Sequence, residues 1–176
     1  EYRYMRPTLR ASLMRSLATN MSHQRGSVRI FEMGKVYLGR TNDLPDERET
    51  AGGVLHGPLS EEGWLSSEDC LGFYDGKGVV ETLLGLLAAS SQFHPIVDPF
   101  LHPGRAVSIL VGESIVGVLG EVHPVVQEAF EVDGGPVAFF ELDLECLRLA
   151  VSQRRDQAMT PGRYPPSIRD LAILVN

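Results

Sequence analysis

Two apolar segments joined by a very short turn constrain the fold of this chain most. Residues 106–111 and 115–122 are rich in Val, Ile and Leu, and only Gly112-Glu113-Ser114 separates them. A three-residue connection that contains glycine is typical of a β-hairpin, because parallel strands need a crossover of about a dozen residues or more. The sequence therefore predicts a sheet that is antiparallel at this point.

Five further segments have strand-like composition, rich in β-branched and aromatic residues or in alternating polarity. They are residues 28–33, 36–38, 50–56, 93–97 and 137–144. Gly34 lies between the first two and predicts a bend there. In the last segment, apolar residues alternate with Glu141 and Asp143, which predicts a half-buried strand.

Two segments have the character of long helices. In the first, an apolar residue recurs every four positions between Pro7 and Gly26, at Leu9, Leu13, Leu17 and Met21. This spacing predicts an amphipathic helix over residues 8–23. The second helix is expected over residues 76–90, with Asp75 as its N-terminal cap. Its apolar side chains cover more than one face. A helix of that kind is packed on two sides.

A short helix is also expected from His123-Pro124 to about residue 130. Helices mixed with hairpin-connected strands predict an α+β fold with a mainly antiparallel β-sheet flanked by helices.

Composition limits the class of protein. The 176 residues suit one domain, and 43% hydrophobic with 22% charged residues is ordinary for a folded soluble chain. The net charge of −7 is uneven, since residues 1–40 carry eight basic and two acidic side chains whereas residues 41–147 carry three basic and nineteen acidic ones. This balance argues against a domain whose whole surface binds nucleic acid.

The two cysteines, Cys70 and Cys146, form no CxxC pair, which favours a reduced, cytoplasmic setting. No apolar run approaches the roughly 20 residues that a membrane-spanning helix needs. The chain begins at Glu1 without an initiator Met and stops directly after the apolar run 171–175. We therefore expect both ends to be boundaries within a longer protein.

Catalytic and metal-binding motifs are missing from the sequence. There is no phosphate-binding loop of the G-x-x-x-x-G-K-[ST] type, and the five histidines show no metal-ligand spacing. Three of them precede proline, where turn formation is the usual reason. We predict no catalytic and no metal-binding residue. The alternative is an acid–base site built from His102, Arg105, Glu121 and His123.

Seven segments, taken in order, carry a family resemblance. They are residues 6–13, 28–37, 75–81, 102–106, 117–124, 140–143 and 164–172, and they include His102-Pro103-Gly104-Arg105-Ala106. In this order they resemble the β subunit of bacterial phenylalanine–tRNA ligase. Each segment alone is weakly specific, but seven in register along nearly the whole chain are hard to obtain by chance.

The resemblance implies a division of the chain. Residues 1–150 are similar to the family's non-catalytic core module, which has the fold of class II aminoacyl-tRNA synthetases. Residues 151–167 then form a linker, and residues 168–176 start a ferredoxin-like anticodon-binding domain. In that family the active site belongs to the α subunit of an (αβ)₂ heterotetramer, which charges tRNA(Phe) with phenylalanine using ATP and Mg²⁺. No cofactor is expected in this chain itself.

The arginines of a class II active site are absent where the resemblance would place them. Such enzymes bind ATP phosphates with arginines, one of them in a strand of the type Phe-Arg-x-Glu. Here the comparable strand reads Arg29-Ile30-Phe31-Glu32, and the glycine-rich segments 117–120 and 134–135 contain no arginine. We expect the chain alone to be inactive.

Two sets of residues are candidates for contact with partners. The apolar stripe Leu9, Leu13, Leu17 and Met21 is a candidate for burial against the α subunit or the β core, and we expect helix 8–23 to be the more exposed of the two long helices. Weak candidates for RNA contact are Arg154, Arg155, Arg163 and Arg169. They motivate an alternative function, an independent RNA-binding module that uses the basic ends of the chain.

Overall fold

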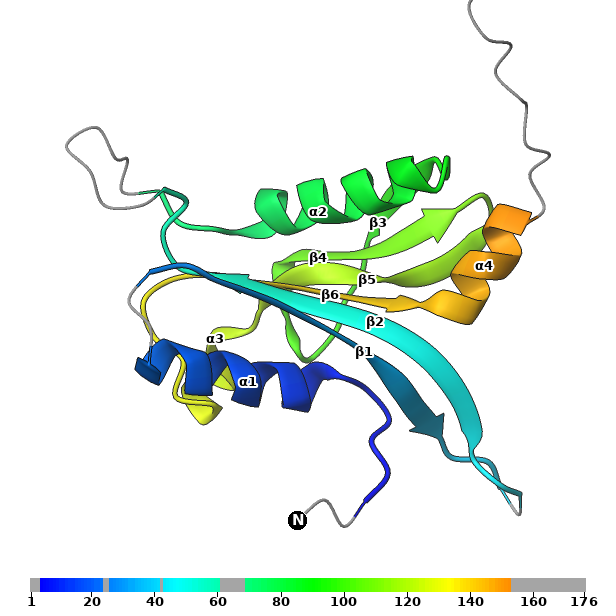
Figure 1. Ribbon diagram of the computed structural model, residues 1–176, viewed down its shortest axis with the longest axis horizontal. Coiled ribbons are helices and arrows are strands. Elements are labelled where there is room, and N and C mark those ends of the chain that lie inside the picture. The colour runs from blue at the N-terminus through cyan, green and yellow to red at the C-terminus, as the bar shows by residue number, and fades with distance from the viewer. Residues whose placement is uncertain (1–3, 24–25, 42, 61–68, 153–176) are drawn as a thin grey trace, which may run out of the picture.

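The chain folds around one antiparallel sheet with helices on both of its faces. The computed structural model describes residues 4–23, 26–41, 43–60 and 69–152. The six strands lie in the order β1-β2-β6-β5-β4-β3, and every neighbouring pair is antiparallel. Helices α2 and α4 cover one face, and α1 and α3 lie on the other (Figure 1). The predicted α+β architecture is confirmed.

The elements follow one another along the chain with short connections. The strands are β1 (Val28–Leu38), β2 (Asp46–His56), β3 (Ser91–Pro95), β4 (Leu101–Val111), β5 (Ser114–Val122) and β6 (Val137–Asp143). The helices are α1 (Arg10–His23), α2 (Phe73–Leu86), α3 (Pro124–Ala129) and α4 (Leu144–Ser152). None of these helices is long and apolar enough to cross a membrane.

The predicted hairpin is present as β4 and β5, with Gly112 in the turn at a φ of 63°. The bend expected at Gly34 is wrong. β1 continues through this glycine, which pairs with Thr50 of β2. The Arg6 guanidinium packs against this glycine, in the position that a Cβ atom would occupy.

Strand β6 lies at the centre of the sheet and is buried on both faces over Val137–Phe140. Val137 and Phe139 belong to the hydrophobic cluster under α1, whereas Ala138 and Phe140 belong to the cluster under α2. The prediction of a half-buried strand is therefore wrong for this part. The sequence pattern showed one apolar face, but a central strand between two helix layers needs two.

Helix α1 is packed against its own sheet. Leu9, Leu13 and Leu17 are buried in the core, and Met21 is partly buried against it. This corrects the expectation that the first helix is the more exposed one. The apolar side chains of this helix were candidates for burial against either the α subunit or the β core. The first three of them are buried in the core of this chain, where Leu9 and Leu13 pack against Gly52, which has no side chain.

Helix α2 begins earlier than predicted and is packed on one side only. It starts at Phe73, and Asp75 lies in its first turn, where the carboxylate accepts the Gly72 N–H at 2.8 Å. Val80 and Leu84 are buried, whereas Leu83, Leu86 and Leu87 are exposed. The expectation of a helix packed on two sides is wrong within the described residues.

Helix α4 was missed by the sequence analysis. Its nine residues directly continue β6, and Leu144 prolongs the alternation of that strand, which hides the start of the helix. The expected linker at 151–167 and the strand at 168–176 lie outside the described residues, apart from Val151 and Ser152 at the end of α4.

Gly117 of β5 offers a test of how closely the strands and side chains pack. A Cβ atom at this position would overlap the carbonyl oxygen of Glu141 in β6, whereas Gly78 of α2 has no heavy atom within 4 Å of such a position. We predict that Gly117→Ala lowers the free energy of unfolding by about 1–3 kcal/mol. Gly78→Ala, the control, should raise it by up to about 1 kcal/mol, since alanine favours helix. Urea unfolding followed by circular dichroism would show equal effects if this packing were wrong.

Candidate functional site

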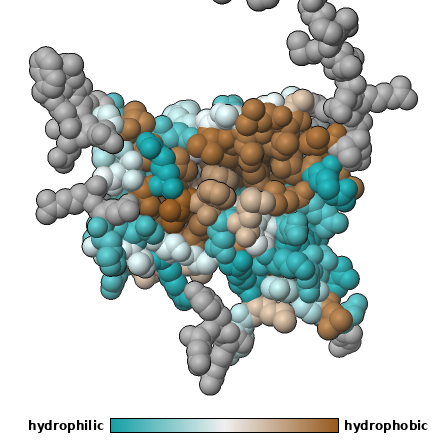
Figure 2. Space-filling view, viewed as in Figure 1, coloured by the Kyte–Doolittle hydropathy of each residue, from teal (hydrophilic) through white to brown (hydrophobic). Residues whose placement is uncertain are grey.

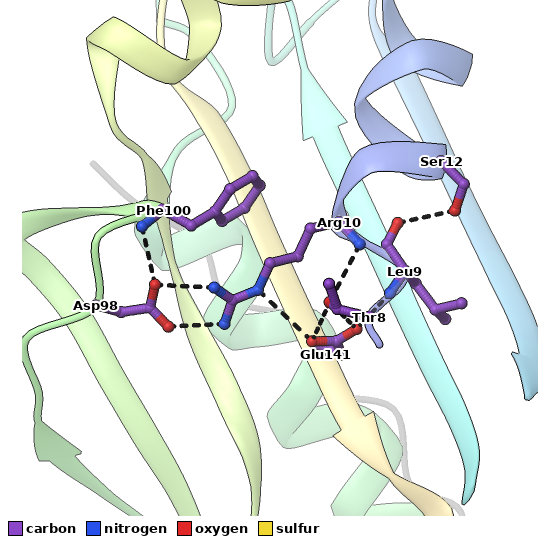
Figure 3. A network of polar contacts seen from close by, with 7 residues as sticks. All are labelled: Thr8, Leu9, Arg10, Ser12, Asp98, Phe100 and Glu141. Atoms are coloured by element: carbon purple, nitrogen blue, oxygen red, sulfur yellow. Dashed lines mark hydrogen bonds and ion pairs between the residues drawn. The ribbon is translucent and has the colours of Figure 1, made fainter. Parts of the chain in front are cut away.

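A network of partly buried charges lies between α1 and the sheet (Figure 3). Arg10, the first residue of α1, donates two parallel hydrogen bonds to Asp98 in the loop between β3 and β4, at 2.9 and 2.7 Å. The Asp98 carboxylate also accepts the Phe100 N–H at 2.9 Å. The pair thus joins the start of a helix to the far half of the sheet in the fixed geometry of a two-bond arginine contact.

Glu141 of β6 is the second carboxylate of this network. It accepts the Thr8 hydroxyl at 2.7 Å and the Leu9 N–H at 2.7 Å, so that it lies at the N-terminus of α1. A carboxylate stabilises this end of a helix, where N–H groups lack partners within the helix. Nε of Arg10 lies 3.7 Å from the other oxygen of Glu141 and makes no hydrogen bond.

Two aromatic rings pack against the Arg10 guanidinium. The Arg10 guanidinium carbon lies 5.0 Å from the ring centre of Phe100 and 6.0 Å from that of Phe139, and the two rings pack edge to face. Only 23% of the Arg10 side chain and 14% of the Asp98 side chain remain exposed. The cation is therefore held by two carboxylates and two ring faces.

This environment changes the acidity of Asp98. Burial opposes the charged form, but the hydrogen bonds from Arg10 and from the Phe100 N–H outweigh it and hold the pKa of Asp98 below its usual value. Asp143, farther along β6, has a lowered pKa for a similar reason, because the Cys146 N–H and Arg48 oppose the effect of burial.

The arginines on this side of the sheet are already neutralised. Arg6 pairs with Glu32, Arg10 with Asp98, and Arg48 with Asp143. The hollow between Arg10, Arg48 and Glu141 has a volume of about 200 Å³, below the roughly 300–1,000 Å³ typical of small-molecule sites. The residues described here thus offer neither free cations nor space for a nucleotide at this position.

The alternative acid–base group has structural roles instead. Arg105 forms an ion pair with Glu121, and the other oxygen of Glu121 accepts the Phe73 N–H at 3.1 Å, at the start of α2. The rings of His102 and His123 stack with their centres 6.5 Å apart. His102 accepts the Gly104 N–H, and His123 caps α3 by accepting the Val125 N–H. The interpretation of these histidines as turn residues agrees with the position of His123 at a helix cap, whereas His102 lies within β4.

A cavity of about 500 Å³ opens beside this second group. It is lined by residues that include Tyr74, Asp75, Arg105 and Glu121. The two carboxylates already accept backbone N–H groups of the chain itself. Within the described part of the chain, no three His, Cys, Asp or Glu side chains gather in a way that could hold a metal ion. The RNA-contact candidates Arg154, Arg155, Arg163 and Arg169 lie outside the described residues.

Comparison with known proteins decides the family. Residues 1–144 match the family model described as the phenylalanyl tRNA synthetase beta chain CLM domain. The chain belongs to this family. The resemblance inferred from the seven sequence segments is thereby confirmed.

Relatives support the assignment over nearly the whole chain. The phenylalanine–tRNA ligase beta subunit of Geobacter sulfurreducens is 37% identical over 178 residues, which cover 99% of this chain and 22% of that protein. The beta subunit of Dehalococcoides mccartyi strain 195 is 35% identical, with coverage of 100% and 22%. The chain thus spans about a fifth of the length of these relatives.

A solved structure has a similar fold. The pyrrolysyl tRNA synthetase PylSc of Desulfitobacterium hafniense superimposes with a TM-score of 0.62 at 17% sequence identity, over 84% of this chain and 50% of that one. At this identity the likeness concerns the fold alone, and it confirms the predicted synthetase-like sheet of a phenylalanyl-tRNA synthetase β-chain domain.

The lowered pKa of Asp98 predicts a specific loss of stability in acid. Its stabilising contribution is present above the pKa of an unfolded Asp, about 3.9, and is lost as the pH falls through the lower pKa of the folded state. Between about pH 5 and about pH 3 the wild type should lose more of its free energy of unfolding than Asp98→Asn. Parallel pH profiles of the two proteins in urea unfolding would refute this role of Asp98.

Removal of the Arg10 side chain should destabilise the domain more than removal of one charge from an exposed surface pair. Arg10→Ala leaves the carboxylates of Asp98 and Glu141 partly buried without their cation, and we expect a loss of about 2–3 kcal/mol, between the values for surface and buried pairs. Lys35→Ala breaks an exposed pair with Glu47 and should leave the unfolding midpoint almost unchanged. A similar midpoint for both variants would show that the network contributes little.

Proposed function

We propose that this chain is a non-catalytic structural module of the β subunit of phenylalanine–tRNA ligase. The module packs, within the whole subunit, against a catalytic α subunit in an (αβ)₂ heterotetramer. The assembled cytoplasmic enzyme attaches phenylalanine to tRNA(Phe) with ATP and Mg²⁺. The family assignment supports the parent enzyme, since the relatives named above are β subunits of this ligase.

One observation carries the non-catalytic role. Transfer of an adenylyl group requires cations that are free to bind phosphate oxygens and the charge of the transition state. On the sheet face beneath α1, Arg6, Arg10 and Arg48 each pair with a carboxylate of the chain itself. Their hydrogen-bonding capacity therefore stabilises the fold and is withdrawn from a substrate.

The role of the network is then to keep the module rigid. Arg10 and Glu141 bind α1 to β6, and Asp98 binds α1 to the loop before β4. A rigid module presents a constant surface to its partner, which lowers the entropic cost of association. ATP and Mg²⁺ belong to the assembled enzyme in this proposal, and no step of the reaction passes through the residues described here.

The direct test is ATP–pyrophosphate exchange in the presence of phenylalanine. We predict no exchange above background for this chain alone, and exchange when the whole β subunit is combined with the α subunit. In that assembled enzyme, Arg10→Met in the β subunit should lower the yield of heterotetramer. Its KM for ATP should stay within about twofold of wild type, because a structural residue affects assembly rather than substrate binding.

Two results would overturn the proposal. The first is formation of phenylalanyl-adenylate by this chain without an α subunit. The second is a KM for ATP raised about tenfold or more by Arg10→Met in heterotetramer of normal mass and stability, because that effect would place Arg10 in contact with substrate.

A further inference from the structure

The sheet face that carries α2 and α4 is incompletely covered. A groove of about 540 Å³ runs between α2 and the first two strands, and its lining includes Arg29, Leu55, Leu59, Leu71, Val79 and Thr82. We call it the α2 groove. Its apolar lining continues into the hydrophobic core, because Leu55 and Leu71 also belong to the buried cluster beneath α2.

Large apolar side chains of α2, β1 and α4 also face solvent. Leu86 of α2 is 82% exposed, and Phe31 and Met33 of β1 are 76% and 64% exposed. Val79 and Leu83 of α2, Leu87 directly after it and Leu149 of α4 are also exposed. Figure 2 shows a broad hydrophobic area on this side, over α2 and toward α4. Contiguous apolar surface of this extent is typical of an interaction site.

The shape of α2 suits close approach by another helix. Gly78 and Thr82 lie one turn apart on its exposed side, and nothing lies within 4 Å of a Cβ position on Gly78. Val79 and Leu83 stand beside them. Small positions next to a ridge of larger apolar ones form the surface into which side chains of a second helix pack.

The charge at the groove indicates which kind of molecule can bind there. Arg29 of β1 is exposed at the groove and forms no ion pair with any residue of the described part of the chain. Asp75, the groove's carboxylate, already accepts the Gly72 N–H. The complementary occupant is therefore an apolar helix with an acidic residue opposite Arg29, rather than an RNA, which requires several cations.

We propose that the α2 groove binds an amphipathic helix supplied by another part of the same β subunit. Two observations favour this source. The groove is continuous with the core of the chain, and an apolar surface of that kind resembles a domain core cut in two rather than a transient contact. The β-subunit relatives are also far longer than this chain, which covers 22% of their length. The helix completes the layer formed by α2 and α4.

The test compares one thiol in two proteins. Val79→Cys, in the lining of the groove, is introduced into this chain and into the whole β subunit without an α subunit, and its modification by a maleimide is followed by peptide mass spectrometry, which separates it from Cys70 and Cys146. We expect at least tenfold slower labelling in the whole subunit. Ile115→Cys, at an exposed position in the β4–β5 hairpin, is the control and should label alike in both proteins.

The charge is tested separately. Arg29→Glu should lower the melting temperature of the whole β subunit by about 2–4 °C, and Arg29→Lys should largely restore it. In this chain alone, Arg29→Glu should leave the melting temperature unchanged, because the proposed acidic partner belongs to another part of the β subunit. An equal loss in both proteins would contradict the role assigned to Arg29.

Other outcomes overturn the inference in distinguishable ways. Equally fast labelling of Val79→Cys in both proteins shows an open groove. Protection that appears only when the α subunit is added assigns the surface to that subunit, which supports the proposed function while refuting this occupant. Protection in this chain that rises with its concentration assigns the groove to a second copy. Failure of the ATP–pyrophosphate prediction leaves these labelling results unaffected.

Discussion

The carboxylate of Glu141 is the contact on which the arrangement of this domain depends. It projects from the central strand β6 to the N-terminus of α1, where it accepts a hydroxyl and a backbone N–H and lies next to Arg10. This contact fixes the position of α1 over the sheet, and the position of α1 in turn buries Leu9, Leu13 and Leu17. A local electrostatic contact at a helix end thus determines which apolar side chains are buried between the helix and the sheet.

The same contacts support the proposed non-catalytic role of this synthetase-like fold. The sheet resembles that of a solved tRNA synthetase, yet the arginines beneath α1 bind carboxylates of their own chain. Cations used in this way stabilise the fold and hold little capacity for a phosphate. A shared fold therefore does not imply a shared activity, and the function has to be argued from the charges on the sheet.

The two faces of the sheet differ in how completely they are covered. Beneath α1 the apolar stripe of the helix meets the sheet, and the polar contacts close its margin. On the other face, α2 and α4 leave Phe31, Met33 and Leu86 exposed, and a groove with apolar lining opens beside α2. Because exposed apolar surface is typical of an interaction site, the second face is the one proposed above to bind other structure.

The sequence by itself determined the β4–β5 hairpin, the two long helices and the family, because period, turn residues and ordered segments are local properties. It did not determine that β6 is buried on both faces or that α1, rather than α2, is the more buried helix, since both depend on strand order. Nor did it pair Arg10 with Asp98 and Glu141, which lie 88 and 131 positions away and meet only when the sheet forms. Only the tertiary structure decided which charges are neutralised and which apolar side chains remain open, because burial is a property of the assembled layers and not of any one segment.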